Sequence, residues 1–350
     1  MDSDDISTAI RRRPAVMADV GRLAGVSHQT VSRVINGSPH VREETRQRVI
    51  AAMRELDYRP NSAARALVTG RSSTLGVVSF DTTLYGPAST LFGIERAAHA
   101  AGYFVIVASL EALDRDSVCD AVERLRLHGV DGILMIAPLQ EAVDALRELP
   151  SDLPMVAVEA GAADSMPVAA VDQHAGAVAA TRHLLELGHV TVWHVAGPPD
   201  WLEARQRLAG WRDALVEGDA FAPPPLTGDW SASSGYSLGR ALSRDRDVSA
   251  VFVANDQMAL GVLRALHEAG RRIPRDVSVV GFDDIPEAQF FTPPLTTIRQ
   301  DFGELGRRGV RLLLRAMAAG AQWVQEPPVV PELIVRSSTA VTAGTGAIRV

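Results

Sequence analysis

Polar side chains of the types that bind small ligands follow apolar runs in the second half of this sequence. Asn255 follows AVFVA, and Asp283 follows VSVVGF. Arg207 lies at the start of a helix-length segment after HVAG, and Trp230 lies in the loop-like run LTGDWS. Carboxylates, amides and a guanidinium can hydrogen-bond the paired hydroxyls of a sugar, while an aromatic ring covers its apolar face. The set therefore indicates a binding site for a polar small molecule.

A second set lies near the N-terminus, in the run GVSHQTVSRVINGSPHV at residues 25–41. A helix here would have a polar face opposite an apolar one: His28, Gln29, Ser32 and Arg33 against Val31, Val34 and Ile35. Amide and guanidinium groups match the major-groove edges of adenine and guanine, and the first turn of a recognition helix reaches them. This face is typical of a DNA-reading helix.

Charge is distributed unevenly along the chain, whose net charge is −7. Residues 11–71 contain twelve arginines and five acidic residues, which gives this segment a charge of +7 and leaves the remainder at −14. A basic segment attached to an acidic body suits phosphate contact by the segment alone.

Composition excludes several kinds of chemistry. All 35 basic residues are arginine, so no lysine is available for Schiff-base or P-loop chemistry. The single cysteine, Cys119, excludes an internal disulfide and a cysteine zinc site, and His183 and His189 lack the register of one helical metal face. We expect no catalytic residues, no metal and no cofactor. A glycosidase would need two positioned carboxylates, and Glu159 with Asp283 is better interpreted as a pair of hydroxyl acceptors.

Compartment is indicated by two further features. No apolar run reaches the length of about 18 residues that a membrane span needs, and the start MDSDD is unlike a basic signal peptide. We expect a cytoplasmic protein without a membrane partner.

Three short helices are predicted at the N-terminal end. They cover residues 16–23, a segment capped by Ser27 that ends near residues 36–37, and residues 43–56. With the turn at residues 24–26, they form a helix-turn-helix pattern. Residues 62–69 could form a further helix capped by Asn61, but about two turns are marginal alone, so this helix should form only when it is held.

From residue 73 onward, apolar runs alternate with helix-length segments. The runs TLGVVSF, YFVIVASL, GILMI, PMVAVE, VTVWHVAG, AVFVAN and VSVVGF predict an α/β fold with parallel sheets covered on both faces. The strands form two sets that divide near residues 170–172. LTTI, residues 302–319 and PELIVRSS are interpreted as crossovers that close the two lobes. Small ligands bind at the carboxyl ends of such strands, here between the lobes.

The sequence resembles the LacI/GalR family of sugar-responsive repressors. The similarity rests on GVSHQTVSRVINGSPHV, AAMRELDYRPN, RLAGW, GDWS, VANDQMALG, VSVVGFDD and PPLTTIRQDF, in family order from about residue 16 to 340. It implies a disordered tail at 1–15, a DNA-binding head at 16–60, a hinge helix at 61–72 and a periplasmic-binding-protein-like body at 73–340. The N-lobe would comprise 73–171 and 302–329, and the C-lobe 172–301 and 330–340, with a tail at 341–350.

The resemblance also implies how DNA is bound. Two heads of a homodimer would read a pseudo-palindromic operator, while Leu67 of each hinge helix wedges into a central base step. Because the chain ends in TAVTAGTGAIRV instead of a leucine-heptad tail, a dimer is implied rather than a tetramer. The DNA-binding residues implied are Ser27, His28, Gln29, Thr30, Ser32, Arg33, Asn36, Asn61, Arg65 and Leu67.

For the effector, the resemblance implies a sugar bound between the lobes that lowers operator affinity. The implied binding residues are Phe80, Leu84, Gly86, Pro87, Glu159, Arg207, Trp230, Asn255, Asp283, Gln300 and Phe302. The member of the family that the chain most resembles has an aspartate at Glu159 and a serine at Phe80, and a tyrosine at His28. A galactoside is the first candidate, and a β-glucoside, an oligosaccharide fragment or a corepressor stays open. A transport-type sugar-binding protein shares the body, but it would need a signal peptide and no DNA head.

Overall fold

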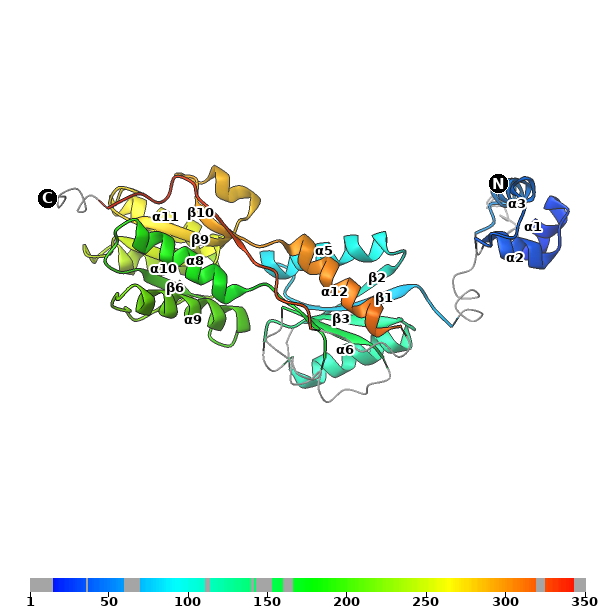
Figure 1. Ribbon diagram of the computed structural model, residues 1–350, viewed down its shortest axis with the longest axis horizontal. Coiled ribbons are helices and arrows are strands. Elements are labelled where there is room, and N and C mark those ends of the chain that lie inside the picture. Colours follow the sequence, from blue (N-terminus) through cyan, green and yellow to red (C-terminus); the bar gives the residue numbers. More distant parts are fainter. Residues whose placement is uncertain are drawn as a thin grey trace, which may run out of the picture. The chain divides into compact units, whose positions relative to one another are not determined.

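A computed structural model of the chain describes residues 15–35, 37–59, 70–110, 114–139, 142, 153–159, 166–318 and 325–342. The chain divides into two units, Met1–Ser72 and Ser73–Val350, and each is described by itself (Figure 1). Asn36, Asn61, Arg65 and Leu67, and with them the predicted hinge helix, lie outside the described residues, as do 1–14 and 343–350.

The first unit contains the three predicted helices, α1 (Met17–Ala24), α2 (His28–Ile35) and α3 (Glu43–Glu55). The helix ends fall within a residue or two of the prediction. A small core forms where the apolar faces meet, from Val20, Ala24, Val31, Val34, Val49 and Ala52. Gly25 ends α1 with φ of 65°, a left-handed conformation that glycine adopts without steric cost.

The first lobe of the second unit is built on a parallel sheet in the order β2-β1-β3-β4-β5. Its strands are β1 (Thr74–Phe80), β2 (Phe104–Leu110), β3 (Gly132–Ile136), β4 (Met155–Val158) and β5 (Val168–Ala169). Helices α5 (Tyr85–Ala100) and α12 (Phe302–Ala316) pack together, and α6 (Arg115–Leu127) packs against β1 and β2 (Figure 1). β1 and β3 are buried over nearly their whole length, as their continuous apolar runs predict.

The second lobe has a sheet in the order β11-β10-β9-β8-β6-β7, in which only the β10–β11 pair is antiparallel. The strands are β6 (Trp193–Ala196), β7 (Leu226–Thr227), β8 (Ala250–Val253), β9 (Ser278–Asp283), β10 (Thr296–Arg299) and β11 (Glu332–Ile334). The accompanying helices are α8 (Gln173–Glu186), α9 (Leu202–Glu217), α10 (Ala232–Leu242), α11 (Asp256–Glu268) and the short 3-10 helix η1 (Pro286–Phe290).

Two of the late segments lie in the predicted lobe but form strands of its sheet. LTTI and PELI are the adjacent strands β10 and β11 of the second lobe, so they are not crossovers. The chain passes between lobes in the connections around them, at residues 170–172, 300–301 and 325–331. Two of these run side by side, because Val329 donates its backbone N–H to Ala170 and accepts one from Asp172, over 2.8 and 2.9 Å.

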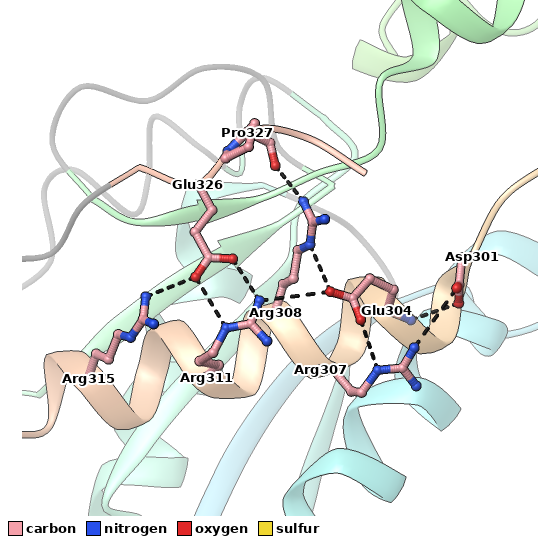
Figure 2. A network of polar contacts seen from close by, with 8 residues as sticks. All are labelled: Asp301, Glu304, Arg307, Arg308, Arg311, Arg315, Glu326 and Pro327. Carbon is pink, nitrogen blue, oxygen red and sulfur yellow. Dashed lines mark hydrogen bonds and ion pairs between the residues drawn. The ribbon is translucent and has the colours of Figure 1, made fainter. Parts of the chain in front are cut away.

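Three arginines along one side of α12 contact the connection at residues 325–331 (Figure 2). Arg311 and Arg315 both pair with Glu326, at 2.7 and 2.9 Å. One turn away, Arg308 pairs with Glu304 at 3.0 Å and also donates to the carbonyl of Pro327. The connection at residues 325–331 is therefore tied to α12 by ion pairs and by the hydrogen bond from Arg308 to the Pro327 carbonyl.

The expectation that all strands are covered on both faces is wrong for β2. It is an edge strand, and only its last residue, Leu110, is buried. The side chains of Phe104, Ile106 and Val107 are exposed, as is Phe92 on neighbouring α5. An apolar edge of this kind is a common site of association with another chain.

Candidate functional site

A hollow opens between the two lobes, where the carboxyl ends of both parallel sheets meet. Its free space is about 380 Å³, including the part open to solvent. The cavity proper measures about 30 Å³, well below the roughly 300–1,000 Å³ of small-ligand sites, so a sugar would fit only after the lobes or the lining side chains move apart. The lining comes from both lobes: Leu84, Tyr85, Gly86, Pro87, Glu159, Trp201, Glu203, Arg207, Trp230, Asn255, Gln257, Asp283, Gln300 and Phe302.

Ten of the eleven residues expected at the effector site lie in this lining. The exception is Phe80 at the end of β1, which lies behind the wall and packs on Trp201 with ring centroids 6.5 Å apart. Arg205, which precedes Arg207 in the same helix, is exposed and does not take part.

At one end of the hollow, Asp283 closes a ring of polar contacts with three other side chains. Arg207 donates to Gln173 at 2.9 Å, Gln173 donates to Gln300 at 2.8 Å, and Gln300 donates to Asp283 at 2.7 Å. The ring is completed by the Arg207 guanidinium, which lies 3.8 Å from the Asp283 carboxylate. Burial raises the pKa of Asp283 to about 6, although Arg207 and Gln300 oppose the shift. We call this region the Asp283 end.

At the other end, two carboxyl groups face each other. Glu159 follows β4, and Glu203 lies in the first turn of α9, one turn before Arg207. The side chains are close enough to share a proton, and burial raises the pKa of both well above the usual range of a glutamate. Thr90 donates its hydroxyl to one oxygen of Glu159, whereas no N–H or O–H of the described residues reaches the other oxygen, which can be satisfied by a proton shared with Glu203 or by a donor from outside. We call this region the Glu159 end.

Aromatic rings form the walls between the two ends. Trp230 and Trp201 meet edge to face with centroids 5.5 Å apart, and Tyr85 meets Phe302 in the same way at 5.8 Å. The Trp230 ring lies on Gly197, where a Cβ atom would come within 2.1 Å of it, so only glycine fits there. Trp230 is only 6% exposed, and its buried indole N–H has no hydrogen-bond partner.

Three residues that line the hollow have strained backbone conformations. Glu159, Trp230 and Asp283 have φ values of 63°, 72° and 109°, in a region that residues with a side chain rarely adopt. Such conformations persist where surrounding structure imposes them, and they are concentrated at binding sites. The strain therefore marks the same residues as the unpaired polar atoms and the buried charge.

Asn255 lies in the wall, but its amide is already used. Its oxygen accepts from the backbone of Met258 and caps α11, while its nitrogen donates to the Trp230 carbonyl at 3.0 Å. The neighbouring Asp256 accepts from Thr297 and from the backbone of Ile285, so it supports the loop after β9 and is not among the lining residues.

Five contributors were missed by the sequence interpretation: Tyr85, Gln173, Trp201, Glu203 and Gln257. For Glu203 a signal existed, because a spacing of four places it on the same helical face as Arg207. Trp201 enters the wall because residues 138–139 of the first lobe pair with the start of α9, where Leu202 donates to the Pro138 carbonyl at 2.8 Å. No local pattern reveals that contact.

In the first unit, the polar face of α2 is directed away from the core. Ser27, His28, Gln29 and Arg33 are exposed, and Thr30 and Ser32 are half-buried. Ser27 caps the helix by accepting from the backbone of Thr30 at 3.3 Å. The side chains that suit base edges are therefore presented together on one side of a rigid three-helix unit.

The described part of the chain contains no cluster of three or more side chains able to hold a metal ion. Within the same residues, no helix has the length and apolar character to cross a membrane.

A helix-turn-helix unit joined to a two-lobed body with a polar interlobe hollow defines the class of ligand-responsive DNA-binding regulators. Residues 16–61 match the model of bacterial regulatory proteins of the lacI family, and residues 181–339 match that of a periplasmic binding protein-like domain. The chain is 36% identical to the lactose operon repressor of Escherichia coli K12, over 95% of this chain and 92% of that one. It is 34% identical to the transcriptional repressor PurR of Haemophilus influenzae, over 93% and 98%.

Solved structures agree. A structure of the lac repressor dimer bound to operator and the anti-inducer ONPF matches with a TM-score of 0.83 at 35% identity, covering 94% of this chain and all of that one. A complex of the transcriptional regulator CelR with cellobiose matches with a TM-score of 0.68 at 31% identity, over 93% and 99%. The chain belongs to the LacI family, as its sequence motifs predicted. It is a DNA-binding transcription regulator with an effector-binding body, and the family is not one of enzymes.

Proposed function

We propose that the protein is a repressor whose affinity for a pseudo-palindromic operator falls when a small sugar binds in the interlobe hollow. The effector part rests on one observation: buried polar groups without partners are combined with flanking aromatic rings at Trp230 and Glu159. A sugar supplies hydroxyls for the polar atoms and an apolar ring face for the aromatic walls. The similarity to a regulator solved with cellobiose supports a sugar effector.

Operator recognition is assigned to the exposed face of α2. His28, Gln29 and Arg33 would choose the bases, while Ser27, Thr30 and Ser32 suit phosphate or base contact. Asn36 and the hinge residues Asn61, Arg65 and Leu67 complete the proposed set, with Leu67 inserted into the minor groove at the centre of the operator. The basic charge of residues 11–71 supports this assignment.

A homodimer is proposed because two heads are needed to read a two-fold operator. The exposed apolar edge formed by Phe92, Phe104, Ile106 and Val107 supports association through the first lobe. Introducing a charge with Ile106→Glu should convert the dimer to monomer in analytical ultracentrifugation and weaken operator binding. An unchanged sedimentation coefficient would contradict this placement of the interface.

Effector and operator are expected to oppose each other. Closure of the lobes around a sugar would alter the first lobe and release the hinge helices, so that each ligand weakens the other by the same factor. A galactoside is the first candidate, because the runs TTLYGP, RLAGW and GDWS are similar to those of lactose-operon regulators. Another glycoside or an oligosaccharide is the rival, since Glu159 and Phe80 depart from that pattern.

The test begins with an operator selected from a random DNA library by the full-length protein. Galactosides, glucosides and cellobiose are then titrated into the complex, and operator release is followed by fluorescence anisotropy. At least one sugar should release the DNA from the wild type and from the exposed control Glu287→Gln, and none should release it from Asp283→Asn. Retention of DNA with every sugar would contradict the proposal, and tighter binding would identify a corepressor.

The DNA side is tested by repeating the selection with Gln29→Ala. Each bidentate side chain contributes about 1–3 kcal/mol of base discrimination, so preference at one base pair of each half-site should relax. Sugar binding, measured by calorimetry, should stay unchanged. Selection of the wild-type operator with undiminished preference would exclude Gln29 from base recognition.

A further inference from the structure

The charges inside the hollow do not balance. Three carboxyl groups, those of Glu159, Glu203 and Asp283, line it together with one guanidinium, that of Arg207. Arg207 is committed to the Asp283 end, where it contacts Asp283, Gln173 and the carbonyl of Ala254. Among the described residues, no arginine or histidine forms an ion pair with Glu159 or Glu203.

The geometry of Glu159 shows that this excess of acid faces the ligand. Glu159 is 5% exposed, and one of its oxygens accepts from Thr90, which holds the carboxyl in place. The other oxygen has no hydrogen-bond partner and belongs to a residue that lines the hollow beside Glu203. A buried acceptor must be satisfied, so this oxygen either shares a proton with Glu203 or accepts from a ligand.

We propose that the effector is an amine-bearing sugar, whose ammonium group lies between the carboxyl groups of Glu159 and Glu203. The inference rests on the proposed function and narrows its effector class. The ammonium would donate to the unpaired oxygen of Glu159 and to Glu203, and the sugar ring would lie between the aromatic walls toward Asp283.

An ammonium suits this end better than a hydroxyl does. With a neutral sugar the two adjacent carboxyls must retain a proton between them, because two like charges in a buried site repel each other. A cation with several N–H donors lets both carboxyls ionise and converts their repulsion into two charge-assisted hydrogen bonds. Trp201 lines the same hollow, and aromatic faces also attract cations.

The remaining unpaired group fits the body of the same ligand. The Trp230 indole N–H needs an acceptor, which a sugar hydroxyl or ring oxygen supplies. At the far end, Asp283 accepts from hydroxyls. The hollow therefore offers an anionic end for one amine and a mixed polar and aromatic remainder for a neutral sugar ring.

The test compares three forms of each sugar by calorimetry with the full-length protein at about pH 6.5, where an amine is protonated. The probes are D-glucosamine and D-galactosamine, their N-acetyl derivatives, and D-glucose and D-galactose. We expect at least one free hexosamine to bind about tenfold or more tightly than its N-acetyl and neutral counterparts. Equal or tighter binding of the neutral sugar would overturn the inference, as would no detectable binding of either hexosamine.

Variants locate the amine. Glu203→Gln and Glu159→Gln should each reduce hexosamine affinity by about tenfold or more, with little change for the neutral sugar. Glu287→Gln, an exposed glutamate of the second lobe, is the matched control and should bind as the wild type does. Thermal unfolding verifies that the variants are folded, and undiminished hexosamine affinity in folded Glu203→Gln and Glu159→Gln would overturn the placement.

Operator release separates this inference from the proposed function. If neutral sugars release the DNA and hexosamines do not bind, the function holds and the amine inference fails. If hexosamines bind with the predicted preference but never alter operator affinity, the amine site holds and the repressor mechanism fails.

Discussion

At the Asp283 end of the hollow, a buried carboxylate has a guanidinium and an amide as partners, whereas at the Glu159 end two carboxyls face each other. Each end contains one residue with a strained backbone conformation at a strand end: Asp283 is the last residue of β9, and Glu159 directly follows β4. At the Asp283 end, the protein itself supplies a counter-charge and a hydrogen-bond donor to the carboxylate, without any ligand. At the Glu159 end, no N–H or O–H of the described residues reaches one oxygen of Glu159, so its partner is either a proton shared with Glu203 or a donor on the ligand.

This difference separates two roles of buried charge. A paired charge within a closed ring of hydrogen bonds fixes side chains in place, and breaking it leaves the partner unsatisfied. A pair of like charges destabilises the empty site and is relieved on binding, which makes it a source of selectivity. The comparison therefore predicts opposite responses to removing one charge at either end.

The largest effect is expected for Asp283→Asn. Asparagine tolerates the positive φ at this position, but the variant leaves the buried guanidinium of Arg207 without a counter-charge. The free energy of unfolding, measured by urea denaturation at neutral pH, should fall by about 2 kcal/mol, because removing the buried charge of Asp283, whose pKa is raised, offsets part of the cost of leaving Arg207 without its partner. A loss no greater than that of Glu287→Gln would show that the ring does not stabilise the body.

Glu159→Gln should have a smaller effect of opposite sign. Glutamine preserves the acceptor for Thr90 while removing a charge that burial disfavours. Because the pKa of Glu159 is raised in the folded state, its stabilising contribution is complete at low pH and is lost as the pH rises through the raised pKa. The variant should therefore match the wild type near about pH 5 and exceed it by about 1 kcal/mol near about pH 8, without ligand.

If Glu159→Gln and the wild type were equally stable at both pH values, the carboxyl pair at the Glu159 end would not destabilise the empty site. The pKa of Asp283 is also raised, so the wild type should itself lose stability as the pH rises from acid to neutral. Glu203→Gln provides the independent check, since it removes the other member of the like-charge pair.

Trp230→Phe should have the smallest effect. The phenyl ring keeps most of the contact with Trp201 and Gly197, and the substitution deletes only the unpaired indole N–H. Stability should change by less than about 1 kcal/mol, whereas sugar affinity should fall by about fivefold because one hydrogen bond is lost. A large loss of stability with unchanged affinity would assign Trp230 to the core alone.

Much of the fold could be predicted from the sequence, because its elements depend on local patterns. The apolar stripe of α3 and the continuous apolar runs of β1 and β3 are visible in short windows. The placement of β10 and β11 was not, since their pairing joins residues more than 30 positions apart. Nor was the exposed edge at β2, whose apolar run is indistinguishable from that of a buried strand.

In the site, too, some residues could be predicted from local patterns, whereas others are placed by contacts with distant segments. Asp283 and Arg207 were identifiable from residue type and position after a strand or at a helix start. Gln173 and Trp201 enter the site only through contacts with distant segments, and no pattern around them indicates this. Phe80 was expected in the lining, but it packs on Trp201, which lines the hollow while Phe80 does not.

The most direct test of the account counts the protons exchanged when a hexosamine binds. Titrations at about pH 7 in two buffers of different ionisation enthalpy give this number for the wild type and for Glu203→Gln. If the ammonium ionises the Glu159–Glu203 pair, the wild type should release up to about one proton for each hexosamine bound, and the variant should release markedly less. No release, or proton uptake, by the wild type would contradict the account.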